Sequence, residues 1–453
     1  MASLCNILSI FNNINSIENK TLENLKLDLI NTGHQNLSFK EDLENDLILI
    51  HHNKFGKSNI QLTDLENQCR NLILTTNLEP LCYHYNEIIY NPTNLSDIDF
   101  KNAIVQESIE GTTILCFNHN DKWFVSTRRC LDASKSMWIP KYSYKQLLDD
   151  IICSKLENPT DEDRQSKIDE FFNILDKSLC YFFVLLHPDN KNIVNINMND
   201  KSLVHFMTRK KGSIEEVDVN NSLYEFEYGL VEKSPEYKNY DEQKIVDLLD
   251  QMNMENEDKK GITREGLVIR YYNKDGTCDV LKLQTSKYKK VKDIKPNNNN
   301  EQHSYLELFK NNNLSEYLEL CTRKTVQNKG KIIKRLSEVF INLSTEILIL
   351  YFKTRDKQNK ETYENLTKDY KDILYKIHGI YKKKCEENKT EEKVKVVRND
   401  VYKLLKDTIS TREIISLLIN RKKLLDNKVD IFARNTQSII LTTKLLSPQV
   451  QSV

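Results

Sequence analysis

The chain has 453 residues, 39% hydrophobic and 29% charged, which is enough for two or three domains whose cores need no disulfide or structural metal. Its 10 cysteines include no CxxC pair and no Cys/His group at ligand spacing, which excludes a zinc ribbon and a secreted disulfide framework. No apolar stretch approaches bilayer length and the N-terminus lacks a signal-peptide pattern, so we expect an intracellular, cytoplasmic protein.

Residues 1–60 mix polar and apolar positions with partly helical spacing and predict an N-terminal helical extension. From there to residue 294, short runs rich in β-branched and aromatic residues predict strands. Hairpins are predicted for residues 112–127 and for residues 266–284, where Asp275-Gly276 supplies the turn. Helical patterns interrupt the strands at 143–157, 162–177 and 242–254. Residues 61–294 are therefore predicted to form an α+β domain built on antiparallel sheets.

An Asn-rich break at 295–304 precedes a segment whose pattern is helical. Hydrophobic residues there recur at i, i+3, i+4 and i+7, namely Ile332, Leu336, Val339, Phe340, Leu343 and Ile347. Residues 305–453 are therefore predicted to form a basic, all-α domain. Counting residues 301–453 gives 30 basic and 20 acidic side chains, a surplus of +10 in a chain of zero net charge. Such a surplus is a candidate polyanion-binding surface, although a solvated Lys-rich face and A/T-rich coding are commoner causes.

The peptide at residues 106–129 carries the most chemical information. A predicted strand reaches Glu110-Gly111, turns, and continues through a hairpin to Arg128 and Arg129. This peptide resembles the covalent nucleotidyltransferases, and most closely the first family of bacteriophage-type ATP-dependent RNA ligases. In that superfamily the peptide reads KxDG, then Ser or Thr, then a hairpin that ends near TRG. Glu110, Gly111 and Arg128 match this pattern, but Ser108 stands where the superfamily has its catalytic lysine.

Four further segments fall in the order that the resemblance requires. Arg70 stands at the position of a phosphate-contacting arginine, and Val184 replaces the carboxylate that would contact the ribose. Glu265 begins an EG-hydrophobic motif and would hold the metal ion or its water shell. Lys282 matches the first lysine of a K-x-K strand, and Gln284 replaces the second. The resemblance thus implies nucleotide contacts from Arg70, Glu110, Arg128 and Lys282, with ATP and Mg²⁺ as cofactors and RNA as partner. It also implies antiparallel sheets around a cleft, followed by an all-helical domain.

Attack on an α-phosphorus requires a deprotonated amine, cationic groups for the departing pyrophosphate and a carboxylate-bound Mg²⁺. The sequence offers the cations and the carboxylate but no amine at position 108, and a serine without an adjacent general base is a poor substitute. Three hypotheses follow. The preferred one is a catalytically degenerate ligase-like protein that binds a nucleotide or an RNA end. The second is an active enzyme that uses a relocated lysine such as Lys101 or Lys122, and the third is an interaction protein that retains only the fold.

Overall fold

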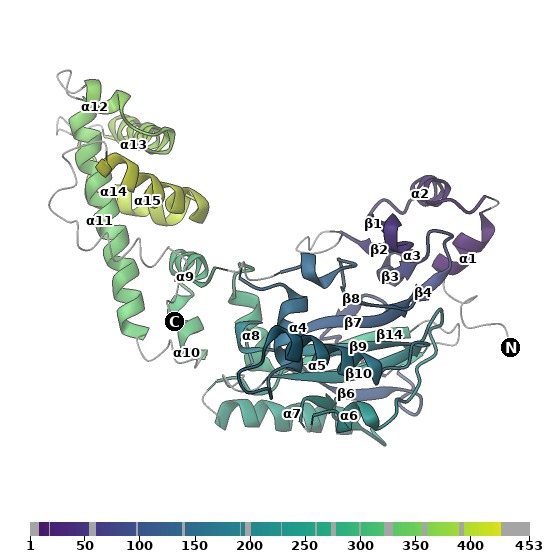
Figure 1. The fold of residues 1–453 in the computed structure, drawn as a ribbon. Helices are drawn as coiled ribbons and strands as arrows, with labels where there is room; N and C mark the ends of the chain where they lie inside the picture. Colours follow the sequence, from purple (N-terminus) through teal and green to yellow (C-terminus); the bar gives the residue numbers. More distant parts are fainter. Residues whose placement is uncertain are drawn as a thin grey trace. The chain divides into compact units, whose positions relative to one another are not determined.

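The computed structural model describes residues 9–17, 19–53, 60–96, 98–137, 141–190, 192–194, 201–227, 229–258, 261–272, 278–298, 300–320, 329–355, 360–388 and 394–426. The chain forms two compact units, residues 1–290 and 291–453, and each is described by itself (Figure 1). Mixed helices and strands followed by a helical C-terminal region confirm the predicted α+β class. None of the helices in the described ranges combines the length and the apolar character that a membrane span requires.

The first sheet lies near the N-terminus and has the order β1-β2-β3-β4. Its strands are β1 (Leu37–Asp42), β2 (Leu47–His52), β3 (Arg70–Leu74) and β4 (Pro80–Cys82), and helices α1 (Ser9–Ser16), α2 (Leu22–Asn31) and α3 (Asp64–Gln68) accompany them. The prediction of a helical extension is right for α1 and α2 and wrong for residues 37–52. These residues form an antiparallel hairpin that pairs with β3. Every residue of β2 is buried, so its continuous apolar run marks a central strand.

The second sheet has the order β11-β10-β9-β7-β8. Its strands are β7 (Thr112–His119), β8 (Lys122–Thr127), β9 (Leu179–Leu186), β10 (Ser202–Lys210) and β11 (Val231–Lys233). The predicted β7–β8 hairpin is confirmed, and its turn residues Asn120 and Asp121 have positive φ angles of 49° and 61°. One face of this sheet packs with α4 (Tyr144–Ile152), α5 (Asp161–Asn173) and α6 (Ser222–Glu225) in a shared hydrophobic cluster. Helices α4 and α5 both begin with capping boxes.

The third sheet has the order β12-β6-β13-β14-β5. Its strands are β5 (Ile88–Tyr90), β6 (Ile104–Ser108), β12 (Glu236–Tyr237), β13 (Gly266–Tyr272) and β14 (Cys278–Gln284), and α8 (Ser286–Ile294) follows the last of them. The second predicted hairpin is confirmed by the antiparallel pairing of β13 with β14, while its turn at 273–277 lies outside the described residues. The predicted helix α7 (Glu242–Asp258) packs on one face of this sheet. Cys278 and Val280 pack on the other face with side chains of the first two sheets.

Alternation along β6 places neighbouring side chains on opposite faces of the third sheet. Glu107 forms an ion pair with Arg264 on the face that α7 covers. Gln106 and Ser108 lie on the opposite face, where the Gln106 amide donates to the backbone carbonyl of Phe206 in the second sheet. The polar residues at the end of β6 therefore face the interior between the sheets.

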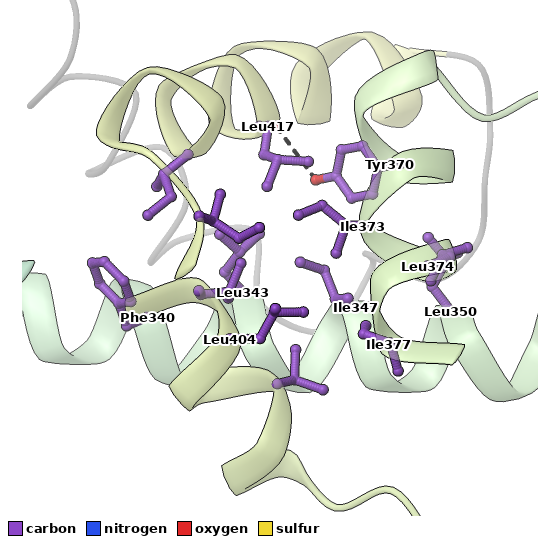
Figure 2. Packing of buried hydrophobic residues seen from close by; sticks show 14 of the residues in the cluster. Phe340, Leu343, Ile347, Leu350, Tyr370, Ile373, Leu374, Ile377, Leu404 and Leu417 are labelled. Atoms are coloured by element: carbon purple, nitrogen blue, oxygen red, sulfur yellow. Dashed lines mark hydrogen bonds between the residues drawn. The ribbon is translucent and has the colours of Figure 1, made fainter. Parts of the chain in front are cut away.

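The second unit is entirely helical in its described ranges. It contains α9 (Glu301–Lys310), α10 (Leu314–Leu320), α11 (Lys329–Arg355), α12 (Lys360–Glu364), α13 (Lys368–Glu387), α14 (Arg398–Lys403) and α15 (Thr411–Asp426), with a π-helical turn at Leu404–Thr408. The predicted apolar stripe of α11 is confirmed, because Phe340, Leu343 and Ile347 are buried against α13 and α15 (Figure 2). The Tyr370 hydroxyl donates to the backbone carbonyl of Leu417 at 3.3 Å, which links α13 to α15 within this core.

Candidate functional site

A buried carboxylate at the start of β13 collects polar side chains from the two strands that flank β13 in the third sheet. Glu265 precedes β13 and is 3% exposed. The Ser108 hydroxyl of β6 donates to its Oε2 at 2.8 Å, and the Lys282 ammonium of β14 lies 2.8 Å from its Oε1. The Gln284 amide also donates to Oε1, at 3.4 Å. Motif positions separated by 157 and 17 residues in the sequence thus meet at one carboxylate.

Gly266 makes this convergence possible. It is the Cα partner of Ser108 on one side and of Gln284 on the other, so it lies at the centre of the three strands. Its φ angle is +146°, and an added Cβ would lie 1.9 Å from the backbone oxygen of Leu283. Only glycine satisfies both the conformation and the space. The glycine of the EG pair is therefore a requirement of the strand geometry.

The ion pair between Lys282 and Glu265 fixes the protonation state of the lysine. Burial opposes the charge on Lys282, but the Glu265 carboxylate and the Tyr90 hydroxyl outweigh burial and raise the pKa of the ammonium. The amine that shares the Glu265 carboxylate with Ser108 is therefore held as a cation. A protonated amine has no lone pair for attack on phosphorus.

The metal ion that the resemblance places at Glu265 does not fit the residues present. Both carboxylate oxygens already accept hydrogen bonds, and one of them faces a fixed positive charge. A divalent cation would have to displace the Lys282 ammonium. Across the described residues, no group of three or more His, Cys, Asp or Glu side chains is arranged to hold a metal ion.

Glu110 and Gly111 support one wall beside this cluster. The Glu110 carboxylate accepts a hydrogen bond from the backbone N–H of Val194 at 2.7 Å, and its carbonyl accepts one from the Asn192 amide at 2.9 Å. A Cβ on Gly111 would lie 2.4 Å from Cγ1 of Val184, so the turn and β9 are in close contact. Val184 is buried, and the predicted site of ribose contact is therefore a packed, apolar surface. Glu110 holds the connection that follows β9.

A second cluster gathers arginines around Glu87. The Glu87 Oε2 atom lies 2.8 Å from Nε2 of His52 and 3.6 Å from Nη1 of Arg70. The Arg70 guanidinium lies over the Tyr85 ring at 5.1 Å from its centroid. Burial, followed by repulsion from Arg70, lowers the pKa of Arg128 to about 10. The sequence pattern identified Arg70 and Arg128 but gave no signal for His52, Glu87 or Tyr85.

The two clusters are neighbours across the pairing of β5 with β14. Tyr90 of β5 is the Cα partner of Lys282. Tyr90 is an electrostatic neighbour of both Lys282 and Arg128. Tyr85 is likewise a neighbour of Lys282, and its ring lies under the Arg70 guanidinium. Arg70 and Arg128 on one side and Glu265 and Lys282 on the other thus lie in neighbouring polar clusters of the first unit.

The two candidates for a relocated nucleophile are Lys101 and Lys122. Lys122 lies at the tip of the β7–β8 hairpin, and its ammonium donates to the Asn45 side chain at 2.9 Å. The tip is seven residues beyond Thr112, a distance of about 23 Å along a strand. Lys101 is an exposed turn residue before β6. Among the described residues, neither lysine makes a hydrogen bond or ion pair with Ser108 or Glu265.

The Glu87 cluster predicts a loss of stability in acid. Burial would raise the pKa of Glu87, but the hydrogen bond from His52 and the charge of Arg70 together lower it from 4.5 to about 2. A carboxyl whose pKa is lower in the folded state stabilises the fold above its unfolded pKa and loses that contribution as the pH falls. We expect the stability difference between wild type and Glu87→Gln, measured by urea unfolding, to be largest above pH 5 and to vanish by about pH 2. A difference that is constant between these values would contradict the ion pairing.

Comparisons with known proteins add weak similarities. No protein family model matches the chain. It is 24% identical over 386 residues to a protein of Invertebrate iridescent virus 6 named immediate-early protein ICP-46 homolog, covering 81% of this chain and 80% of that protein. An archaeal ATP-dependent RNA ligase superposes with a TM-score of 0.39 and 13% identity, covering 71% of this chain and 79% of the other. An RNA ligase of Naegleria gruberi gives a TM-score of 0.28 and 16% identity, covering 53% and 71%.

Proposed function

We propose that the chain is an RNA ligase-like protein of nucleotidyltransferase type that binds a nucleotide or an RNA end without forming a lysyl adduct. One observation carries the proposal: Ser108, at the position of the catalytic lysine, donates its hydroxyl hydrogen bond to Glu265. The convergence of Ser108, Glu265 and Lys282 on one carboxylate supports the resemblance, because these residues are far apart in the sequence and match its motifs in order.

The surroundings of Ser108 support binding rather than covalent chemistry. Ser108 is 2% exposed, and its carboxylate neighbour is balanced by the Lys282 ammonium. A carboxylate neutralised in this way is a weak general base for a hydroxyl whose own pKa is high. The cationic side chains of Arg70 and Arg128 lie beside this cluster, where they suit the phosphates of a ligand.

The covalent step can be tested with ATP labelled at the α-phosphate. After incubation of the full chain with labelled ATP and Mg²⁺, we expect no labelled protein band on a denaturing gel, while equilibrium dialysis detects bound nucleotide. A lysyl adduct is a phosphoramidate that acid hydrolyses, so a band that is lost in acid would overturn the proposal and its mapped residue would name the nucleophile.

RNA binding can be tested through the exposed cations at the start of α11. Lys331, Lys334 and Arg335 are all exposed and follow one another at helical spacing. If they contact phosphates, replacement of all three by glutamine will reduce the slope of log affinity against log salt by about two to three for a single-stranded RNA. An unchanged slope would remove this helix from the RNA-binding surface. Lys376→Gln, which breaks an exposed ion pair with Glu413, is the control for loss of charge in the same unit.

A further inference from the structure

The arginine cluster around Glu87 has the properties of an oxyanion site. Arg70 is 9% exposed, and its Nε finds no hydrogen-bond partner within the part of the chain that the structure describes. A buried guanidinium N–H without an acceptor is costly, and native proteins usually satisfy such a donor with protein, water or ligand. The unsatisfied donor is therefore available to an acceptor outside the described residues, such as a bound anion.

The charges in the cluster favour an anion as that acceptor. Glu87 is the carboxylate whose charge acts on Arg70, Arg128 and Arg129. The Arg70 guanidinium lies 3.6 Å from Glu87, and its positive charge is one of the causes that lower the pKa of Arg128. An oxyanion placed among the guanidinium groups would relieve this repulsion and supply acceptors for several N–H groups at once.

The neighbouring carboxylate offers no role for a divalent cation. Lys282 neutralises Glu265 at 2.8 Å, in the place where the resemblance expects a metal ion. The negative charge of Glu265 is thus balanced by a side chain of the same protein. A phosphate bound by the arginines does not require a metal bridge to Glu265.

We infer that the arginine cluster of Arg70, Arg128 and Arg129 binds a phosphate group without a divalent metal, and that the Lys282 ammonium replaces the metal ion at Glu265. This inference rests on the proposed function and specifies its ligand as a phosphate group carried by a nucleotide or by an RNA terminus. It differs from a ligase site, in which Mg²⁺ organises the phosphates.

Calorimetric titration of the full chain with inorganic phosphate tests the metal requirement. We expect the same Kd within about twofold in EDTA and in Mg²⁺. If the affinity for phosphate is weaker by tenfold or more in EDTA than in Mg²⁺, the inference is overturned. The proposed binding of a nucleotide would still stand in that case. Failure of phosphate, ATP and RNA to bind under either condition would overturn both the inference and the proposed function. Titration with ATP, with a 5′-phosphorylated oligoribonucleotide and with its 5′-hydroxyl counterpart then identifies which phosphate the site selects.

Two substitutions with opposite expected effects separate binding from folding. Arg70→Gln removes the unsatisfied donor and is expected to weaken phosphate binding about tenfold or more. Glu87→Gln removes the competing carboxylate, so we expect tighter phosphate binding, by about threefold or more, and a larger rise in Tm with added phosphate than in the wild type. A destabilised fold does not tighten binding, so tighter binding by Glu87→Gln cannot come from misfolding; weaker or unchanged binding by this variant, at a temperature where its unfolding curve shows it fully folded, would overturn the inference. Arg264→Gln removes an arginine that pairs with Glu107 on the face of the sheet covered by α7, and it should leave the Kd unchanged.

Discussion

Replacement of Gly266 by alanine is expected to destabilise the first unit by about 4 kcal/mol or more, because backbone strain and steric overlap add at this position. The φ angle of +146° is one that residues with a Cβ rarely adopt, and the new methyl group would lie 1.9 Å from the Leu283 carbonyl oxygen. This oxygen belongs to the neighbouring strand and cannot move without breaking the pairing of β13 with β14. Urea unfolding followed by circular dichroism measures the loss.

Gly33 provides a matched control for the contribution of strain alone. Its φ angle is +93°, and an added Cβ would meet no atom within 4 Å. Gly33→Ala should therefore cost only about 1–2 kcal/mol, which is the price of a positive φ angle. Equal losses in the two variants would show that the overlap with Leu283 does not exist and that the third sheet is spaced differently.

The second large effect is expected at the buried pair of Glu265 and Lys282. Replacing Lys282 with methionine leaves the Glu265 carboxylate buried without the ammonium that pairs with it, which is expected to cost about 3–5 kcal/mol. The double variant Glu265→Gln, Lys282→Met removes both charges and should recover a large part of that loss. The coupling free energy from this cycle, measured by urea unfolding at neutral pH, reports the interaction directly.

The exposed pair of Lys376 and Glu413 serves as the control for this cycle. Its nitrogen–oxygen distance of 3.0 Å is similar, but the two side chains are 39% and 47% exposed. Solvent screening reduces the value of such a pair to about 0–1 kcal/mol. A coupling at Glu265 and Lys282 no larger than that of the exposed pair would show that the carboxylate cluster is open to water, and the inference of an internal cation would fail.

Local sequence patterns were sufficient for most of the secondary structure. The strands β6, β7, β8, β13 and β14 and the helices α4, α5, α7 and α11 all lie where alternation, helical periodicity or turn residues predict them. The hairpin at residues 37–52 was missed because β2 is buried along its whole length and has no polar alternation. The short strand β11 pairs in parallel with β10. Parallel strands are joined by a long connection, so no hairpin turn in the sequence indicates this pairing.

The sequence by itself determined the α+β class, the helical C-terminal segment and the ordered positions of Arg70, Ser108, Glu265 and Lys282, because strand periodicity and residue identity are local properties. Only the tertiary structure decided which of these residues form hydrogen bonds and ion pairs with one another. The Lys282 ammonium neutralises Glu265 because the pairing of β13 with β14 sets their side chains 2.8 Å apart. His52 and Glu87 join Arg70 because strands from distant parts of the chain pack together, and contacts of this kind depend on sheet register.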